Sequence, residues 1–97
     1  PYLGVSYVII TKDIAESRGM PEGAYVSAVV QGSPAEKAGL KRGDIILQIN
    51  DEEVTGTNTL SKIINNLEVG DKITLKIDRD GKEITVTAVL GEMPDNY

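Results

Sequence analysis

Apolar and polar residues follow two different periods along the chain, and these predict short strands separated by short helices. Between residues 72 and 78 apolar and polar residues alternate strictly, as expected of a half-buried strand. From Leu60 to Leu67 four apolar residues fall at positions i, i+3, i+4 and i+7, which indicates one face of a helix. Asp80-Gly81, which lies between two alternating segments, predicts a tight hairpin turn.

The same patterns give the order of elements along the whole chain. The expected elements are a strand over 4–10, a helix over 12–18, a strand over 24–30, a helix within 31–39, a strand over 44–50, an edge segment near 53–54, a helix over 58–66, and strands over 72–78 and 83–90. This order predicts a mainly β fold with two or three helices, built as a small, partly open antiparallel barrel capped by helices. One domain is expected over residues 1–91, followed by a C-terminal tail over 92–97.

The segment from Gly32 to Ile46 carries the densest set of local signals. Ser33 suits a helix N-cap and Glu36 stands three residues later, which is a capping-box arrangement. Gly39 suits the left-handed residue that ends a short helix. The sequence therefore predicts a short capped helix that leads through a turn into a buried strand.

Composition and charge exclude several classes of function. The 97 residues carry a formal net charge of −5, which argues against binding nucleic acid or an anionic membrane surface. No apolar run approaches the roughly 20 residues that a membrane-spanning helix needs. The chain does not begin with Met, so we expect it to be a piece of a longer protein.

The chain also lacks the side chains that most often carry catalysis. It contains no His and no Cys, which excludes Ser-His and Cys-His pairs and the usual zinc ligands. The acidic run from Asp51 to Glu53 lacks the alternating spacing of a calcium-binding loop, so we expect a solvated turn there. We therefore expect a non-catalytic fragment with no metal and no cofactor.

The segment Tyr2-Leu3-Gly4-Val5 is one candidate binding element. A glycine between apolar residues can expose consecutive backbone N–H groups, and such a nest can bind a C-terminal carboxylate. A glycine near a strand end can equally form a simple bulge or turn.

The helix expected over 58–66 is a second candidate. Core packing accounts for Leu60 and Ile64, whereas Thr59, Ile63 and Asn66 are expected on a flank that faces the first strand, with Leu67 near its end. A groove between a strand edge and a helix can accept an extended peptide as an added strand. Core packing alone is the alternative for this flank.

These elements together resemble a PDZ domain. The resemblance covers roughly Tyr2 to Leu90 and rests on the segment Gly32–Ile46, on Tyr2-Leu3-Gly4-Val5, on Val69–Leu75 and on Asp78–Lys82. The last three match the form found in bacterial HtrA-type (DegP/DegS-like) serine proteases. The strand order, which begins at the loop and ends with an extra C-terminal strand, also matches the permuted bacterial type.

The resemblance implies a set of peptide-binding residues. The backbone N–H groups of Leu3, Gly4 and Val5 would hold the carboxylate, and Val5, Ser6 and Tyr7 would pair with the peptide backbone. The pocket for the last side chain would be lined by Leu3, Val5, Ile63 and Leu67, with Thr59 and Asn66 on the flank of the groove. Many PDZ domains use a His at the head of this helix, and its absence here implies a purely apolar pocket.

The function implied is capture of hydrophobic C-terminal peptide ends from unfolded or partner proteins. The domain would recruit substrates to, or regulate, the protease domain of an HtrA-type serine protease. That parent would be extracytoplasmic, in the periplasm or cell envelope, and could carry a membrane anchor. Alternatives are a PDZ domain of another membrane-associated or processing protease or of a secretion component, or a structural or oligomer-contact domain without a free peptide ligand. The tail suggests one more partner, because its terminal Tyr97 could dock into the groove of a neighbouring chain.

Overall fold

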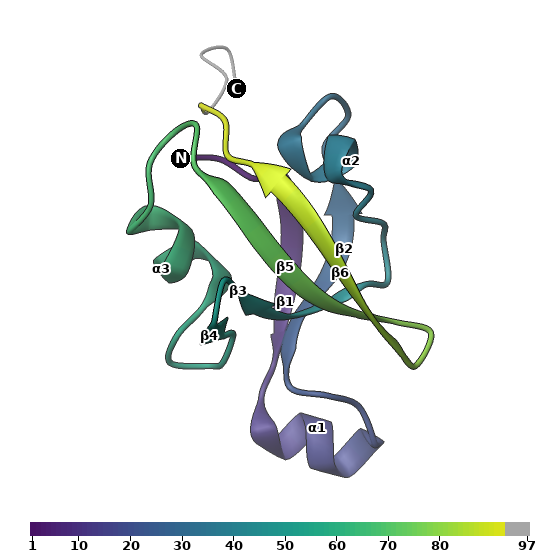
Figure 1. Ribbon diagram of the computed structural model, residues 1–97. Helices are drawn as coiled ribbons and strands as arrows, with labels where there is room; N and C mark the ends of the chain where they lie inside the picture. The colour runs from purple at the N-terminus through teal and green to yellow at the C-terminus, as the bar shows by residue number, and fades with distance from the viewer. Residues whose placement is uncertain (93–97) are drawn as a thin grey trace.

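The computed structural model describes residues 1–92 and contains one antiparallel sheet with three short helices (Figure 1). The expected docking of Tyr97 lies outside the described residues. The elements are β1 (Val5–Ile10), α1 (Lys12–Arg18), β2 (Gly23–Val29), α2 (Pro34–Ala38), β3 (Ile45–Ile49), β4 (Glu52–Glu53), α3 (Leu60–Asn65), β5 (Lys72–Arg79) and β6 (Lys82–Val89).

The sheet has the order β1-β2-β3-β5-β6, and β4 pairs with β3 outside this path. An isolated bridge between Tyr2 and Gly91 links the segment before β1 to the segment after β6, so the sheet curls toward a barrel without closing. The mainly β architecture with capping helices is thereby confirmed. No helix among residues 1–92 has both the length and the apolar character needed to cross a membrane.

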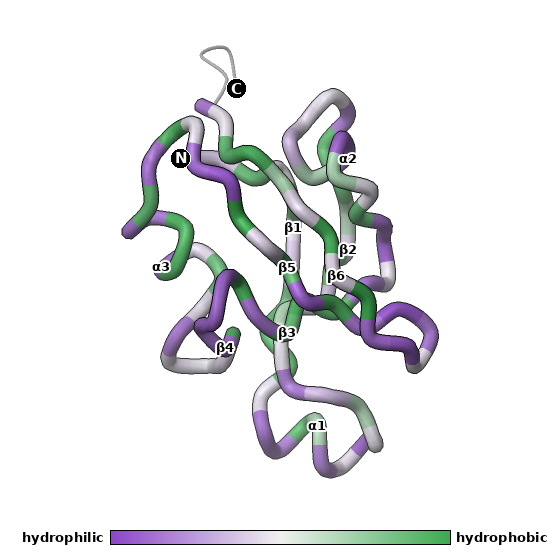
Figure 2. The backbone as a smooth tube through the Cα atoms, viewed as in Figure 1, coloured by the Kyte–Doolittle hydropathy of each residue, from purple (hydrophilic) through white to green (hydrophobic). Residues whose placement is uncertain are grey.

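The alternating pattern of β5 places its apolar residues in the core. Ile73, Leu75 and Ile77 are fully buried, and hydrophobic positions recur along the strands and in α3 (Figure 2). The hairpin between β5 and β6 forms at the predicted turn, where Asp80 and Gly81 both have positive φ (54° and 82°). Two consecutive positive φ values are what a type I′ hairpin turn requires.

The short helix α2 forms as its local signals predict. The Ser33 hydroxyl accepts the Glu36 N–H at 3.2 Å, and the Glu36 carboxylate accepts the Gly32 N–H at 2.8 Å. Gly39 ends the helix in the left-handed conformation. Because α2 is capped at both ends, it presents a fixed surface to the segments that pack on it.

Candidate functional site

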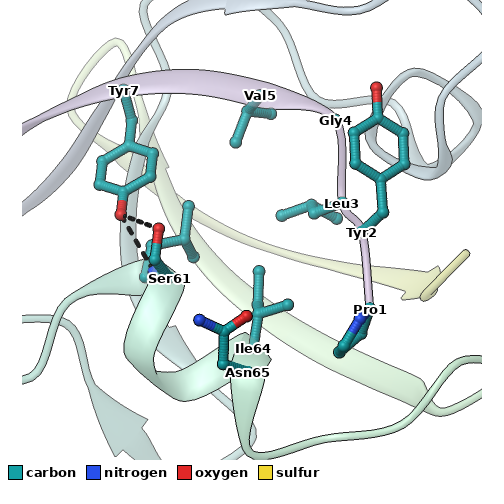
Figure 3. Close-up of a pocket in the computed structure, with 10 residues that line it drawn as sticks. Pro1, Tyr2, Leu3, Gly4, Val5, Tyr7, Ser61, Ile64 and Asn65 are labelled. Carbon is teal, nitrogen blue, oxygen red and sulfur yellow. Dashed lines mark hydrogen bonds between the residues drawn. The ribbon is translucent and has the colours of Figure 1, made fainter. Parts of the chain in front are cut away.

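A pocket of about 240 Å³ lies between β1 with its preceding loop and α3 (Figure 3). This volume is below the roughly 300–1,000 Å³ of ordinary small-molecule sites, so it suits one or two side chains better than a whole ligand. Its walls are Pro1, Tyr2, Leu3, Gly4, Val5 and Tyr7 on one side and Leu60, Ser61, Ile64 and Asn65 on the other. None of these side chains carries a charge.

The strand side of the pocket holds the two strand residues expected there, Leu3 and Val5, together with Tyr7, which the resemblance implied only as a backbone-pairing residue. Leu3, Val5 and Tyr7 all line it, as residues two apart on one face of an extended chain should. Leu3 is buried at the floor, whereas Val5 and Tyr7 are half-buried. Ser6, between them, is exposed on the opposite face.

On the helix side, the face of α3 that lines the pocket differs from the face expected from the sequence. Ile63, expected in the pocket wall, is only 2% exposed and belongs to the core, while Ile64 faces the pocket together with Leu60. Both Ile63 and Ile64 are apolar, so the sequence could not show which of the two faces the groove. The polar neighbours Ser61 and Asn65, four residues apart, are the signal that marks the groove-facing side.

The other three helix residues expected at the groove also lie outside the pocket wall. Thr59 is the N-cap of α3, and its hydroxyl accepts the Lys62 N–H at 3.3 Å. Asn66 terminates the helix, and Leu67 packs against the core as a partly buried residue. The helix is shorter than expected, so these positions fall at or beyond its ends.

The loop before β1 is fixed by its carbonyl groups. The Tyr2 carbonyl accepts the Gly91 N–H at 3.0 Å, the Leu3 carbonyl accepts the Ala35 N–H at 2.8 Å, and the Gly4 carbonyl accepts the Val30 N–H at 2.8 Å. Three different parts of the fold therefore hold three successive peptide planes: the segment after β6, the start of α2 and the end of β2.

This anchoring determines where the N–H groups of the loop point. In a trans peptide the N–H of one residue points opposite to the carbonyl of the residue before it. The N–H groups of Leu3, Gly4 and Val5 therefore point away from the three anchors. Within the described residues, the Leu3 and Gly4 N–H groups have no hydrogen-bond partner.

The edge of β1 next to this loop is also available for pairing. Val5 lies opposite Val29, and the bond from the Val30 N–H to the Gly4 carbonyl joins the residues that flank this pair. Such a bond marks Val5 and Val29 as a non-hydrogen-bonded pair of the antiparallel ladder. The N–H and carbonyl of Val5 therefore point away from β2, toward the outer edge of the sheet.

Gly4 can be only glycine in this arrangement. Its φ is +93°, and a Cβ added there would lie 2.2 Å from the Cβ of Ser33. The Ser33 hydroxyl also donates to the Gly4 carbonyl at 3.5 Å, at the long limit of a hydrogen bond. The N-cap of α2 therefore packs directly against the loop, a contact that the sequence does not predict.

A hydrogen-bonded contact closes the pocket at the end opposite the loop. The Tyr7 hydroxyl lies 2.6 Å from the Ser61 Oγ and accepts the Ser61 N–H at 3.0 Å (Figure 3). We call this pair of hydrogen bonds the Tyr7–Ser61 clasp. It connects β1 to the first turn of α3, 54 positions apart in the sequence.

Comparison with known proteins assigns the family. The family model described as PDZ domain matches residues 1–90. The chain belongs to the PDZ family. The resemblance noted in the sequence is confirmed, including its HtrA type.

The relatives of this PDZ domain are longer proteins that are named as proteases. It is 39% identical over 98% of its length to a probable periplasmic serine endoprotease DegP-like from Marinomonas sp., and 41% identical over 97% of its length to one from Pseudomonas savastanoi pv. phaseolicola. It spans about a fifth of each of these relatives, 21% and 20%. Among solved structures, it resembles the HtrA-type protease AlgW with decapeptide, with a TM-score of 0.77 and 32% identity over 96% of this chain and 29% of AlgW.

Away from the pocket, the carboxylate of Asp44 is buried and accepts hydrogen bonds from other residues of the PDZ domain. Asp44, which is 1% exposed, accepts the Lys41 N–H at 2.9 Å and two hydrogen bonds from the Arg79 guanidinium at 2.9 and 2.8 Å. Burial alone would raise the pKa of Asp44, but the hydrogen bonds from Arg79 and Lys41 together hold the pKa below its ordinary value of 3.8. Arg79 also donates to the Gly39 carbonyl at 2.8 Å, so this ion pair ties the end of α2 to β5.

Proposed function

We propose that this PDZ domain binds the C-terminal ends of peptides by adding them as a strand to the free edge of β1. The observation that carries the proposal is the loop at Leu3, Gly4 and Val5, whose N–H groups are oriented by three anchored carbonyls. A terminal carboxylate has the charge and the acceptor oxygens that such a row of donors binds. The free N–H and carbonyl of Val5 would continue the pairing along the peptide backbone.

The pocket next to the loop supports a hydrophobic last residue. Its floor is formed by Leu3, Leu60 and Ile64, which are 3%, 1% and 6% exposed. An aliphatic or aromatic side chain placed there would be removed from water, whereas a charged one would lose hydration without gaining a partner. The proposed ligands are therefore peptides that end in residues such as Val, Phe or Tyr.

The proposed biological role follows from the relatives. They are named as periplasmic serine endoproteases, and this chain has neither His nor Cys for nucleophilic catalysis of the usual kinds. We propose that the domain is itself non-catalytic and works within an extracytoplasmic HtrA-type protease. There it would recruit substrates with exposed C-termini to the protease domain or regulate that domain when a C-terminus binds.

The role of the carboxylate can be tested by titrating peptides that end in Val, Phe or Tyr against the same peptides with amidated C-termini. Because amidation removes the charge that the N–H groups would bind, we expect affinity to fall at least tenfold. Peptides whose last residue is replaced by Asp provide the control for the pocket and should also bind weakly. Equal affinity of acid and amide forms would contradict the proposal, and so would failure to bind any peptide of a C-terminal library, a result that favours a structural contact domain.

A further inference from the structure

The described part of the chain has a second free sheet edge, on β6, and a helix lies beside that edge too. β6 stands at the opposite end of the strand order from β1, and α2 lies next to the end of β6 (Figure 1). A groove of about 400 Å³ separates β6 from α2. Its walls are Pro34, Lys37 and Ala38 on the helix and residues 87–91 on the strand side, and Lys37 is the one charged residue among them.

The backbone of β6 presents a row of unpaired groups along this edge. The Leu90 N–H donates to the Asp71 carbonyl at 2.9 Å, and the next pair along the ladder joins Val89 to Lys72. Hydrogen-bonded and non-hydrogen-bonded pairs alternate in an antiparallel ladder, so Val89 belongs to a non-hydrogen-bonded pair. The same holds for every second residue before it, which are Thr87, Thr85 and Glu83. The N–H and carbonyl groups of these four residues therefore point away from β5, where no other strand of residues 1–92 pairs with them.

The groove adjoins only half of this edge. Thr87 and Val89 line it, whereas Glu83 and Thr85 do not. Val89 is also one of the large apolar side chains that remain exposed, at 55%. An extended segment that paired with Thr87 and Val89 would satisfy their backbone groups and would cover the Val89 side chain.

Both ends of the described chain lie at this groove. Gly91 lines it, and the bridge from Gly91 to Tyr2 brings the segment before β1 to the same place. The chain spans only 21% and 20% of two relatives, so in a protein of that length further chain joins the domain at one end or both. A segment tethered this close has an effective concentration on the order of 1 mM, so it can occupy the groove even where the same segment would bind weakly as a free peptide.

We propose that the groove between β6 and α2 is a docking site for an extended segment of the parent protein, taken from the chain that adjoins this domain outside residues 1–97. The segment adds as a strand to the edge of β6 at Thr87 and Val89 and places an apolar side chain against Val89. This site is separate from the one proposed for peptide ends, which lies at the edge of β1. The inference rests on the length of the relatives and on the free edge of β6, and it makes no use of peptide binding.

The test is amide hydrogen exchange of the parent protein, measured at the four outward N–H groups of β6. After correction for the intrinsic rate of each residue, Thr87 and Val89 should exchange at least about tenfold more slowly than Glu83 and Thr85, which corresponds to an effective concentration about ten times the dissociation constant of the segment. In the chain of residues 1–97 alone, which lacks the segment, all four groups should exchange at similar rates.

Thr87→Pro and Thr85→Pro form a matched pair of variants. Each removes one outward N–H from the edge strand, where a proline costs no hydrogen bond to β5, but only Thr87 lies at the groove. In the parent protein Thr87→Pro should reduce the slowing at Val89 to about twofold or less, whereas Thr85→Pro should leave it unchanged. Slow exchange in the buried strand β5 shows that each variant is folded.

A second matched pair tests the apolar contact without altering the backbone. Val89→Glu places a charge in the groove, whereas Val8→Glu places one at a valine of β1 that is similarly exposed, 62% against 55%, and does not line the groove. Only Val89→Glu should speed the exchange of the Thr87 N–H in the parent protein, by about fivefold or more.

Several results would overturn the proposal. Equal exchange at all four positions in the parent protein would show that no segment docks there. Slowing at Thr87 and Val89 in residues 1–97 alone would assign the cover to the domain itself, or to a second copy if the slowing disappears on dilution. Slowing that persists in both Thr87→Pro and Val89→Glu would also contradict it. None of these results bears on the binding of peptide ends, which the comparison of acid and amide peptides tests separately.

Discussion

Two regions of this PDZ domain gather hydrogen-bond donors suited to a carboxylate, and they differ in whether a carboxylate of the chain itself occupies them. At Asp44 the carboxylate belongs to the chain, and the Lys41 N–H and the Arg79 guanidinium saturate it. At Leu3 and Gly4 the backbone supplies the donors, and their N–H groups have no partner among residues 1–92. Both regions contact α2, the first at its end through Gly39 and the second at its start.

The comparison separates stability from recognition. Removing one partner of a buried carboxylate with several hydrogen bonds destabilises the fold, because the remaining groups stay buried without compensation. Donors kept free at a strand edge contribute little to stability, and they remain available to a ligand. The fold supports the second region by anchoring its carbonyls, so that the donors are already oriented for the peptide that we propose binds there.

The largest effect is expected from Gly4→Ala, which alters the loop proposed to bind the peptide carboxylate. The added Cβ would meet Ser33 at 2.2 Å in a backbone with φ of +93°. We expect the free energy of unfolding to fall by about 2–5 kcal/mol and peptide binding to be lost. Urea unfolding and peptide titration of the same preparation measure both effects.

Gly70→Ala is the control for the cost in stability of placing a side chain on a backbone with positive φ. Gly70 has the same φ of +93°, but an added Cβ would have nothing within 4 Å. We expect a loss of only about 1–3 kcal/mol, with peptide affinity unchanged. Equal losses of stability in the two variants, with binding retained in Gly4→Ala, would show that the contact with Ser33 does not shape the loop.

Asp44→Asn alters the other region, the ion pair of Asp44 with Arg79, and we expect it to leave peptide binding unchanged. Removing the charge weakens both hydrogen bonds to Arg79, and we expect the free energy of unfolding to fall by about 1.5–3 kcal/mol at pH 7. Peptide affinity of the folded fraction should stay within about twofold of the original, since less than about 0.5 kcal/mol would change at the loop. A large loss of affinity would mean that the two regions are coupled through α2.

Because of Asp44, the free energy of unfolding should also depend on pH in the acid range. Because the folded pKa of Asp44 lies below the ordinary value of 3.8, ionised Asp44 stabilises the fold above that value, and this contribution is lost as pH falls toward the folded pKa. The stability difference between the original domain and Asp44→Asn should therefore be full at about pH 5–7 and shrink below about pH 4. A difference that stays constant down to about pH 2.5 would contradict this assignment.

The smallest expected effects come from substituting two neighbouring isoleucines in α3. Ile63→Val and Ile64→Val each remove one methylene from a buried side chain, and each should cost about 1 kcal/mol of stability. Only Ile64 lines the pocket, so only Ile64→Val should also weaken binding of a hydrophobic C-terminus, by about three- to fourfold. Weaker binding in Ile63→Val alone would restore the groove orientation expected from the sequence.

Much of the fold could be predicted because its signals are local. The bounds of α1, the Ser33 cap of α2 and the Asp80-Gly81 hairpin depend on residues within a few positions of each other. The strand side of the pocket was also predictable. Side chains of a strand alternate between its two faces, so once the strand is known, the residues that share a face are known too. The helix side was not predictable, because Ile63 and Ile64 are both apolar and α3 has only six residues to define its orientation.

The sequence by itself determined the order of the elements, the core face of β5, the glycine at the loop and the lack of the usual catalytic side chains. Only the tertiary structure decided that three distant segments hold the carbonyls of Tyr2, Leu3 and Gly4, that Ser33 packs against Gly4, and that Tyr7 reaches Ser61. The physical reason is the separation along the chain of the groups that interact. Capping and alternation act between neighbours in the chain, whereas the direction of a peptide plane or the partner of a hydroxyl is set by groups that only folding brings together.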